Sequence, residues 1–157
     1  MLLLRFYVFL CLLPDFVKHN PRVHLRFFWN ESTKQLGGVI HWDKDSEGPP
    51  KGAHGASIAM VFDEILAYPI WRSGTGAFTA NLNVNLRRMV PHNSTQRFIA
   101  GIQSRNGRKI ITEGKILSPD EKIVYADCKG LWIEAAHMSA TQRPKEENKA
   151  PVAQSKL

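Results

Sequence analysis

Apolar side chains alternate with polar ones along residues 77–87, so that Phe78 opens an apolar face while Thr79 and three asparagines form a polar one. A period of two over this length predicts a β-strand with one face in the core. Two stretches rich in β-branched and aromatic residues, 25–29 and 38–42, flank a polar segment and predict a hairpin. Three further strands are predicted at 95–105, 108–118 and 122–133, separated by the turn signals Asn106-Gly107 and Ser118-Pro119-Asp120.

Residues 54–68 have the length of a helix and are apolar on almost every side. Such a helix should lie inside the protein, and Pro69 is expected to mark its end or a break in it. The order of elements is two strands, one helix and four strands. This order predicts an α+β fold, in which a curved antiparallel sheet wraps around one long central helix.

The length of 157 residues and an ordinary globular composition, 43% hydrophobic and 22% charged, fit one domain, which we place at 21–134. The segment 1–20 is apolar and poorly defined, and its apolar run is too short for a stable helical membrane span. Residues 135–157 are expected to form a disordered tail, because they contain little to bury. Cys11 and Cys128 form neither a disulfide framework nor a zinc-type spacing, so no metal or redox cofactor is expected.

The formal net charge is +7, and seven basic residues face a single acid between positions 87 and 115. A basic patch of this kind suits nucleic acid, a phosphate-rich small ligand or a solvated surface. The sequence contains no recognition helix, zinc finger or paired-aromatic RNA motif, so we expect no nucleic-acid partner.

The sequence ends on Ser155, Lys156 and Leu157 behind a stretch with two prolines. An exposed C-terminal Ser-Lys-Leu is an address that the peroxisomal import receptor reads. We therefore expect that receptor as a partner and localisation in the peroxisomal matrix.

The helix carries its candidate chemistry at Gly55, directly after His54, and at Asp63. The first N–H groups of a helix lack intrahelical acceptors and sit at the positive end of its dipole, as an oxyanion site requires. Asp63 follows eight residues after Gly55, about 12 Å along the axis, and is expected inside the fold. A buried carboxylate is a candidate functional residue, although a structural ion pair would explain it too.

His54-Gly55, Asp63 eight residues later, Thr79 opening a strand and the pair Arg87-Arg88 resemble the hotdog-fold acyl-CoA thioesterases of the thioesterase superfamily. The resemblance runs from about residue 28 to residue 134. It implies a curved sheet around a central helix, protomers joined edge to edge as a homodimer or a dimer of dimers, and active sites at the dimer interface.

The resemblance also implies roles for individual residues. Asp63 matches the catalytic acid, as general base or nucleophile, and the Gly55 backbone N–H matches the donor to the thioester carbonyl. Thr79 matches the residue that orients the nucleophile from across the interface, and His54 is a candidate contact to the thioester. Arg87, Arg88 and Asn81 are candidates for binding CoA, and Glu64 is expected to be a surface or interface charge.

The expected function is therefore hydrolysis of fatty acyl-CoA to free acid and CoA. Three alternatives stay open from the sequence: a non-catalytic hotdog module that binds acyl-CoA or a protein, a hydratase or dehydratase acting on an acyl-CoA double bond, and a basic nucleic-acid module. Hydratase chemistry needs a catalytic histidine beside its acid, and His54 is the only histidine expected near Asp63.

Overall fold

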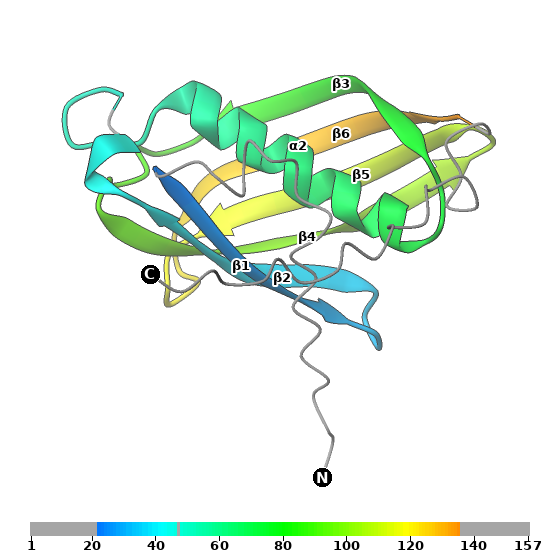
Figure 1. The fold of residues 1–157 in the computed structure, drawn as a ribbon, viewed down its shortest axis with the longest axis horizontal. Helices are drawn as coiled ribbons and strands as arrows, with labels where there is room; N and C mark the ends of the chain where they lie inside the picture. Colours follow the sequence, from blue (N-terminus) through cyan, green and yellow to red (C-terminus); the bar gives the residue numbers. More distant parts are fainter. Residues whose placement is uncertain (1–21, 47, 136–157) are drawn as a thin grey trace, which may run out of the picture.

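The computed structural model describes residues 22–46 and 48–135. Six strands and one long helix make up the described part, with a 3-10 turn before the helix (Figure 1). Their bounds are β1 Val23–Asn30, β2 Gln35–Trp42, η1 Lys44–Ser46, α2 Gly55–Arg72, β3 Ala77–Leu86, β4 Ser94–Asn106, β5 Lys109–Leu117 and β6 Val124–Glu134. The expectations for 1–20, for the tail 135–157 beyond its first residue and for the C-terminal tripeptide lie outside the described residues. Among the described helices, none is long and apolar enough to cross a membrane.

All neighbouring strands pair antiparallel, in the order β1-β2-β4-β5-β6-β3, so β1 and β3 form the two edges of one sheet. The sheet curves and α2 lies across its concave face (Figure 1). The predicted antiparallel sheet around one helix is therefore confirmed in its architecture, and all six predicted strands are present within a few residues of their expected ends.

The core lies between the helix and the inner face of the sheet. Val61, Phe62 and Leu66 of the helix are fully buried, and Ile40 and Ile110 meet them from the sheet side of the same cluster. Burying side chains of this size contributes about 1.5–3 kcal/mol each. This packing fixes the helix against the sheet and with it the position of Asp63.

The structure corrects the prediction that the helix ends or breaks at Pro69. The helix continues through Pro69 to Arg72, and Ser73 caps it by donating its Oγ to the Ile70 carbonyl at 2.7 Å. Proline removes one N–H donor, but Pro69 and Ile70 are buried, so packing outweighs the loss so close to the helix end.

The helix is also not buried on every side. One stripe of small or polar side chains, which includes Ala56, Ala59, Asp63 and Ala67, is half-buried or exposed. The sheet covers one side of α2 only, so this stripe runs along the margin of the core and is partly open to solvent, with β3 beside it at Asp63.

A β-bulge breaks the alternation of β3. Thr79 is opposite Trp132 and Asn81 is opposite the next residue along, Leu131, so Ala80 is unpaired. Opposed residues in an antiparallel pair point to the same face. Because Trp132 is buried, Thr79 belongs to the inner face, whereas the sequence placed it with the asparagines.

The apolar face of β3 consequently differs from the prediction. Leu82 and Val84 pack against the core as expected, but Phe78 lies before the bulge and is 51% exposed, and Leu86 is 55% exposed. The reason is that β3 is an edge strand, whose outer side has no neighbouring strand among the described residues.

Candidate functional site

Asp63 and Thr79 form the centre of the candidate site. The Thr79 hydroxyl donates a hydrogen bond to Asp63 Oδ1, with 2.9 Å between Oγ1 and Oδ1. The bulge at Ala80 makes this contact possible, because it turns Thr79 toward the helix. Bulges of this kind commonly re-aim a side chain beside a functional site. The second oxygen of Asp63 has no hydrogen-bond donor in the described part of the chain.

The Thr79 hydroxyl contacts Asp63 of its own chain, and its expected role across a dimer interface stays a prediction. The geometry corrects one expectation about the pair. Asp63 is half-buried and not enclosed in the core. A half-buried carboxylate can meet a substrate that approaches the open stripe of the helix.

The start of the helix offers a free backbone donor. The Gly55 N–H has no hydrogen-bond acceptor among the described residues, whereas the Ala56 N–H donates to His54 Nδ1 at 3.1 Å. His54 thus acts as the helix cap. In this contact Nδ1 is the acceptor, which describes a positioning role at the helix start.

Gly55 lies under the far end of β3. A Cβ atom built on Gly55 would stand 3.2 Å from Leu86 Cδ1, closer than most side-chain contacts. The absence of a side chain therefore keeps the N–H of Gly55 accessible beside the edge strand. The N–H and the Asp63 carboxylate are about 12 Å apart along the axis, so they cannot act on one carbonyl group within a single chain.

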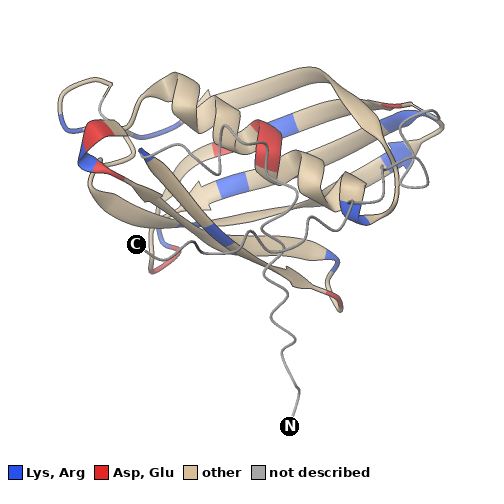
Figure 2. Ribbon diagram, in the orientation of Figure 1, with Lys and Arg blue, Asp and Glu red and all other residues tan. Residues whose placement is uncertain are grey.

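Glu64 shares the middle of α2 with Asp63 (Figure 2). Burial raises the pKa of its carboxyl from 4.5 to about 7, and the neighbouring Asp63 charge adds to this shift. The sequence suggested a surface or interface charge, and the structure adds that this second carboxylate is partly buried within its own chain. In the sequence, Met60 and Tyr68 lie about one helical turn before and after Glu64, and this spacing could have indicated the partial burial of Glu64.

The candidate CoA residues are dispersed. Arg87 forms an ion pair with Asp127 of β6, and Asn85 donates to the same carboxylate at 2.9 Å, which lowers the pKa of Asp127 below its usual value. Arg88 follows on the exposed segment after β3. Asn81 lies beyond the bulge and points to the outer face, away from Asp63.

Carboxylates from other parts of the chain also neutralise part of the basic run from 87 to 115. Arg97 pairs with Glu121 at 2.6 Å, and Arg105 pairs with Glu134 at 3.5 Å. The count of charges along the sequence missed these acids because they come from the β5–β6 turn and from β6. Among the described residues, no group of His, Cys, Asp or Glu could hold a metal ion.

Sequence comparison finds relatives that are named acyl-coenzyme A thioesterases. The bovine (Bos taurus) acyl-coenzyme A thioesterase THEM4 is 33% identical over 107 residues, which are 68% of this chain and 44% of that protein. The human (Homo sapiens) acyl-coenzyme A thioesterase THEM5 is 30% identical over 88 residues, 56% of this chain and 36% of that protein. The chain thus spans less than half the length of these two curated relatives. No family model matches it.

Structure comparison agrees. The crystal structure of a thioesterase superfamily protein matches with a TM-score of 0.65 and 25% identity, over 69% of this chain and 55% of the other. A Streptococcus mutans protein bound to acetyl CoA matches with a TM-score of 0.65 at 12% identity, over 71% of this chain and 89% of the other. In sequence and fold, the chain is therefore similar to hotdog-fold acyl-CoA thioesterases, and the predicted resemblance to this family is confirmed.

Proposed function

We propose that the protein is an acyl-CoA thioesterase that hydrolyses fatty acyl-CoA to the free acid and CoA. The hydrogen bond from Thr79 to Asp63 Oδ1 carries this proposal. It fixes one carboxylate oxygen and leaves the other available on the open stripe of α2. A carboxylate held in this way is suited to act on a thioester that approaches between small side chains.

Hydrolysis needs a group that activates or delivers the nucleophile and a donor where negative charge develops. We assign the first task to Asp63, which either removes a proton from water or attacks the thioester carbon itself. In both cases, attack on the carbonyl carbon moves its π electrons to oxygen, and collapse of that oxyanion releases the CoA thiolate, which takes up a proton. If Asp63 is the nucleophile, water then hydrolyses the acyl–Asp63 anhydride to the free acid and restores the carboxylate. The Gly55 N–H is the proposed donor to the oxyanion.

We further propose that two chains build each site. Asp63 and Gly55 of one chain are about 12 Å apart along the helix, so the oxyanion donor must come from the Gly55 of a second copy. The β3 edge supports this assembly, because it lacks a strand neighbour in the part of the chain that the structure describes and exposes Leu86, with Met89 beyond it, to 55% each. An exposed apolar edge strand readily pairs with another chain.

The CoA moiety needs cations for its phosphates. Arg88 is the better of the two arginine candidates, because the Asp127 carboxylate already neutralises Arg87. Asn81 lies on the outer face of β3, so in this proposal it contacts CoA only where the nucleotide passes over the edge of the sheet.

The first experiment measures thiol release from a panel of short, long, branched and aryl acyl-CoAs. Asp63→Asn should lower turnover by about 100- to 10,000-fold, the range typical of general acid–base groups. Glu121→Gln is the matched control, since Glu121 lies in an exposed ion pair away from α2. Full activity of Asp63→Asn would refute the role of Asp63. Binding of acyl-CoA without any turnover by the wild type would favour the non-catalytic module.

The assembly has its own test. Sedimentation of the wild-type protein should give a dimer or a larger species, and Leu86→Asp should yield monomers that keep their circular dichroism but lose thiol release. A fully active monomer would contradict the two-chain site and leave the role of Asp63 untouched.

A further inference from the structure

A cavity of about 930 Å3 lies at the opposite end of α2 from Gly55 and contains neither Asp63 nor Thr79 in its lining. It forms where the β1–β2 hairpin stops short of its neighbour. β2 begins at Gln35, opposite Gly101, whereas β4 continues to Asn106 with only β5 beside it. The uncovered part of β4, the hairpin turn and the end of α2 enclose the space.

The walls of the cavity combine apolar surface with cations. Trp29, Pro69, Ile99 and Ile102 provide the apolar surface. The cations are Lys34, Arg72 and Lys115, and the Arg72 guanidinium carbon lies 6.0 Å from the centre of the Trp29 ring. Volumes between about 300 and 1,000 Å3 are typical of sites for small organic ligands.

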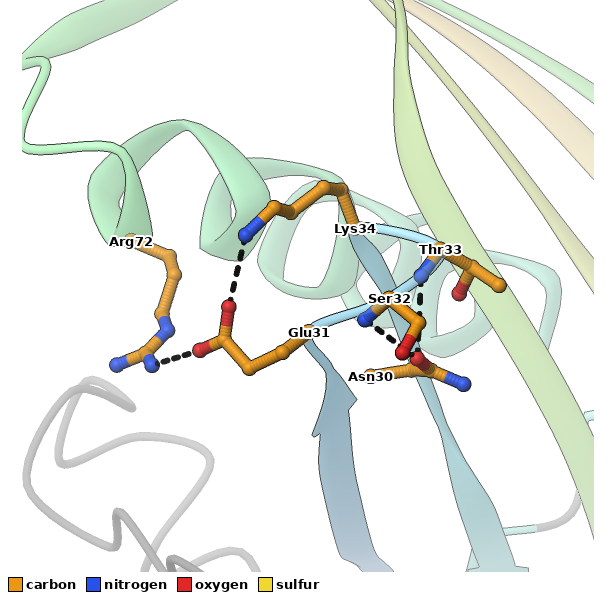
Figure 3. A network of polar contacts seen from close by, with 6 residues as sticks. All are labelled: Asn30, Glu31, Ser32, Thr33, Lys34 and Arg72. Atoms are coloured by element: carbon orange, nitrogen blue, oxygen red, sulfur yellow. Dashed lines mark hydrogen bonds and ion pairs between the residues drawn. The ribbon is translucent and has the colours of Figure 1, made fainter.

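Two carboxylates also line the cavity, but only one of them faces its cations. Glu113 pairs with Lys129, a residue outside the cavity, at 3.5 Å. Glu31 instead lies between two of the lining cations, with its carboxylate oxygens 2.6 Å from Arg72 Nη2 and 2.9 Å from Lys34 Nζ (Figure 3). A carboxylate therefore already occupies the position where an anionic ligand would meet both cations.

Glu31 can leave this position without disturbing the fold. The turn that carries it is held by the Asn30 side chain, which accepts hydrogen bonds from the N–H groups of Ser32 and Thr33 at 2.9 and 3.1 Å. The Glu31 side chain itself is 61% exposed. Exposed ion pairs contribute little to stability, so a ligand anion can replace this carboxylate at small cost.

We propose that this cavity binds an organic anion with an apolar body, and that Glu31 holds the place of that anion in the free protein. The ligand head would bind Arg72 and Lys34, since arginine matches carboxylate and phosphate geometry well. Its body would lie against Trp29 and Ile102, which both belong to the helix side of the sheet. The inference is independent of the proposed hydrolysis, because it uses none of the residues around Asp63.

Calorimetric titration of the full-length protein with dodecanoate and with AMP tests this site and distinguishes a carboxylate lipid from a phosphate-bearing planar ligand. Arg72→Gln should weaken binding about tenfold or more, because it removes a charged hydrogen-bond donor. Glu31→Gln should tighten binding about threefold to tenfold, because it releases both cations from a competing charge.

Glu121→Gln is the matched control, because Glu121 also pairs with an arginine at 2.6 Å and is similarly exposed, but lies outside the cavity. Binding should be unchanged in this variant. Absence of binding by both probes, or weaker binding in a folded Glu31→Gln variant, would overturn the proposal. An effect of Asp63→Asn on thiol release alone would bear only on the proposed hydrolysis.

Discussion

The two flanks of α2 carry adjacent carboxylates in different surroundings. On the side toward β3, Asp63 accepts a hydrogen bond from Thr79. One residue later, Glu64 accepts no such hydrogen bond from the described residues, and burial raises its pKa to about 7. The two side chains point about 100° apart around the helix. The environment on each flank, more than the residue type, therefore decides which carboxylate is prepared for chemistry.

The Glu64 flank belongs to the side of the helix toward β1. Tyr68, one turn after Glu64, packs edge-on against Phe27 with ring centres 5.0 Å apart and lies 6.3 Å from Trp29. This flank is apolar and offers a carboxylate few donors, which is why desolvation dominates there. On the opposite flank, the bulge in β3 brings a hydroxyl to Asp63.

Deleting Ala80 should have the largest effect on this contrast. Removal of the bulge restores a regular register, so Thr79 turns to the outer face and Asp63 loses its donor. We expect thiol release to fall by at least 100-fold, because both the donor and the fit of the edge strand change. The check is a kinetic assay beside a thermal melt. Deletion of Gln103, which lies in the irregular part of β4 on the far side of the sheet, provides the control.

Thr79→Val should have the next largest effect, since it keeps the shape of the side chain and removes the hydroxyl. Loss of a hydrogen bond to a charged group corresponds to about 10- to 150-fold in turnover. Thr95→Val is the matched control, because Thr95 also bonds through its hydroxyl, at 2.9 Å from His41, but on the outer face. Equal turnover in Thr79→Val and wild type would show that the donor has no part in the reaction.

Glu64→Gln should change the pH dependence of stability. The folded state holds the Glu64 proton more tightly than the unfolded state does, since the folded pKa is about 7 against 4.5. Its contribution is present below pH 4.5 and is lost as the pH rises through 7. Because solvent screens the charge, we expect Glu64→Gln to gain on the order of 1 kcal/mol at pH 8 and nothing at pH 4.

Urea unfolding at both pH values measures this difference, with Glu121→Gln as the control for losing an exposed carboxylate. A Glu64→Gln variant that is less stable than wild type at pH 8 would mean that Glu64 is paired and ionised. That result would remove the contrast between the two flanks.

The smallest expected effect distinguishes Arg87 from Arg88, which follow directly after the end of β3. Arg88→Gln should raise the KM for acyl-CoA severalfold, whereas Arg87→Gln should raise it by about twofold or less, because Asp127 already neutralises Arg87. Steady-state kinetics with one acyl-CoA at fixed ionic strength decides between them. The reverse order would assign the CoA phosphates to Arg87.

The sequence was sufficient to predict the strands and the helix, because alternation and helical periodicity reflect burial directly. Both patterns survive small errors at the ends of the elements. The pair Asp63 and Thr79 came from a resemblance to a family, and the structure adds the contact between them.

The remaining features depend on contacts that are distant in sequence. The bulge at Ala80 exists because β3 must match β6, about fifty residues later, and no local pattern encodes that register. The continuation of α2 past Pro69 depends on core packing. The neutralised basic run and the burial of Glu64 likewise arise from neighbours that only the folded chain brings together.

The partner of β3 also sets the order in which the protein can mature during its synthesis. Asp63 and Thr79 are only sixteen residues apart, yet the register that turns Thr79 inward is supplied by β6, the last described strand. A nascent chain that has left the ribosome only as far as β5 lacks the template for this register. The carboxylate and its donor therefore come together late, when the C-terminal strand closes the sheet.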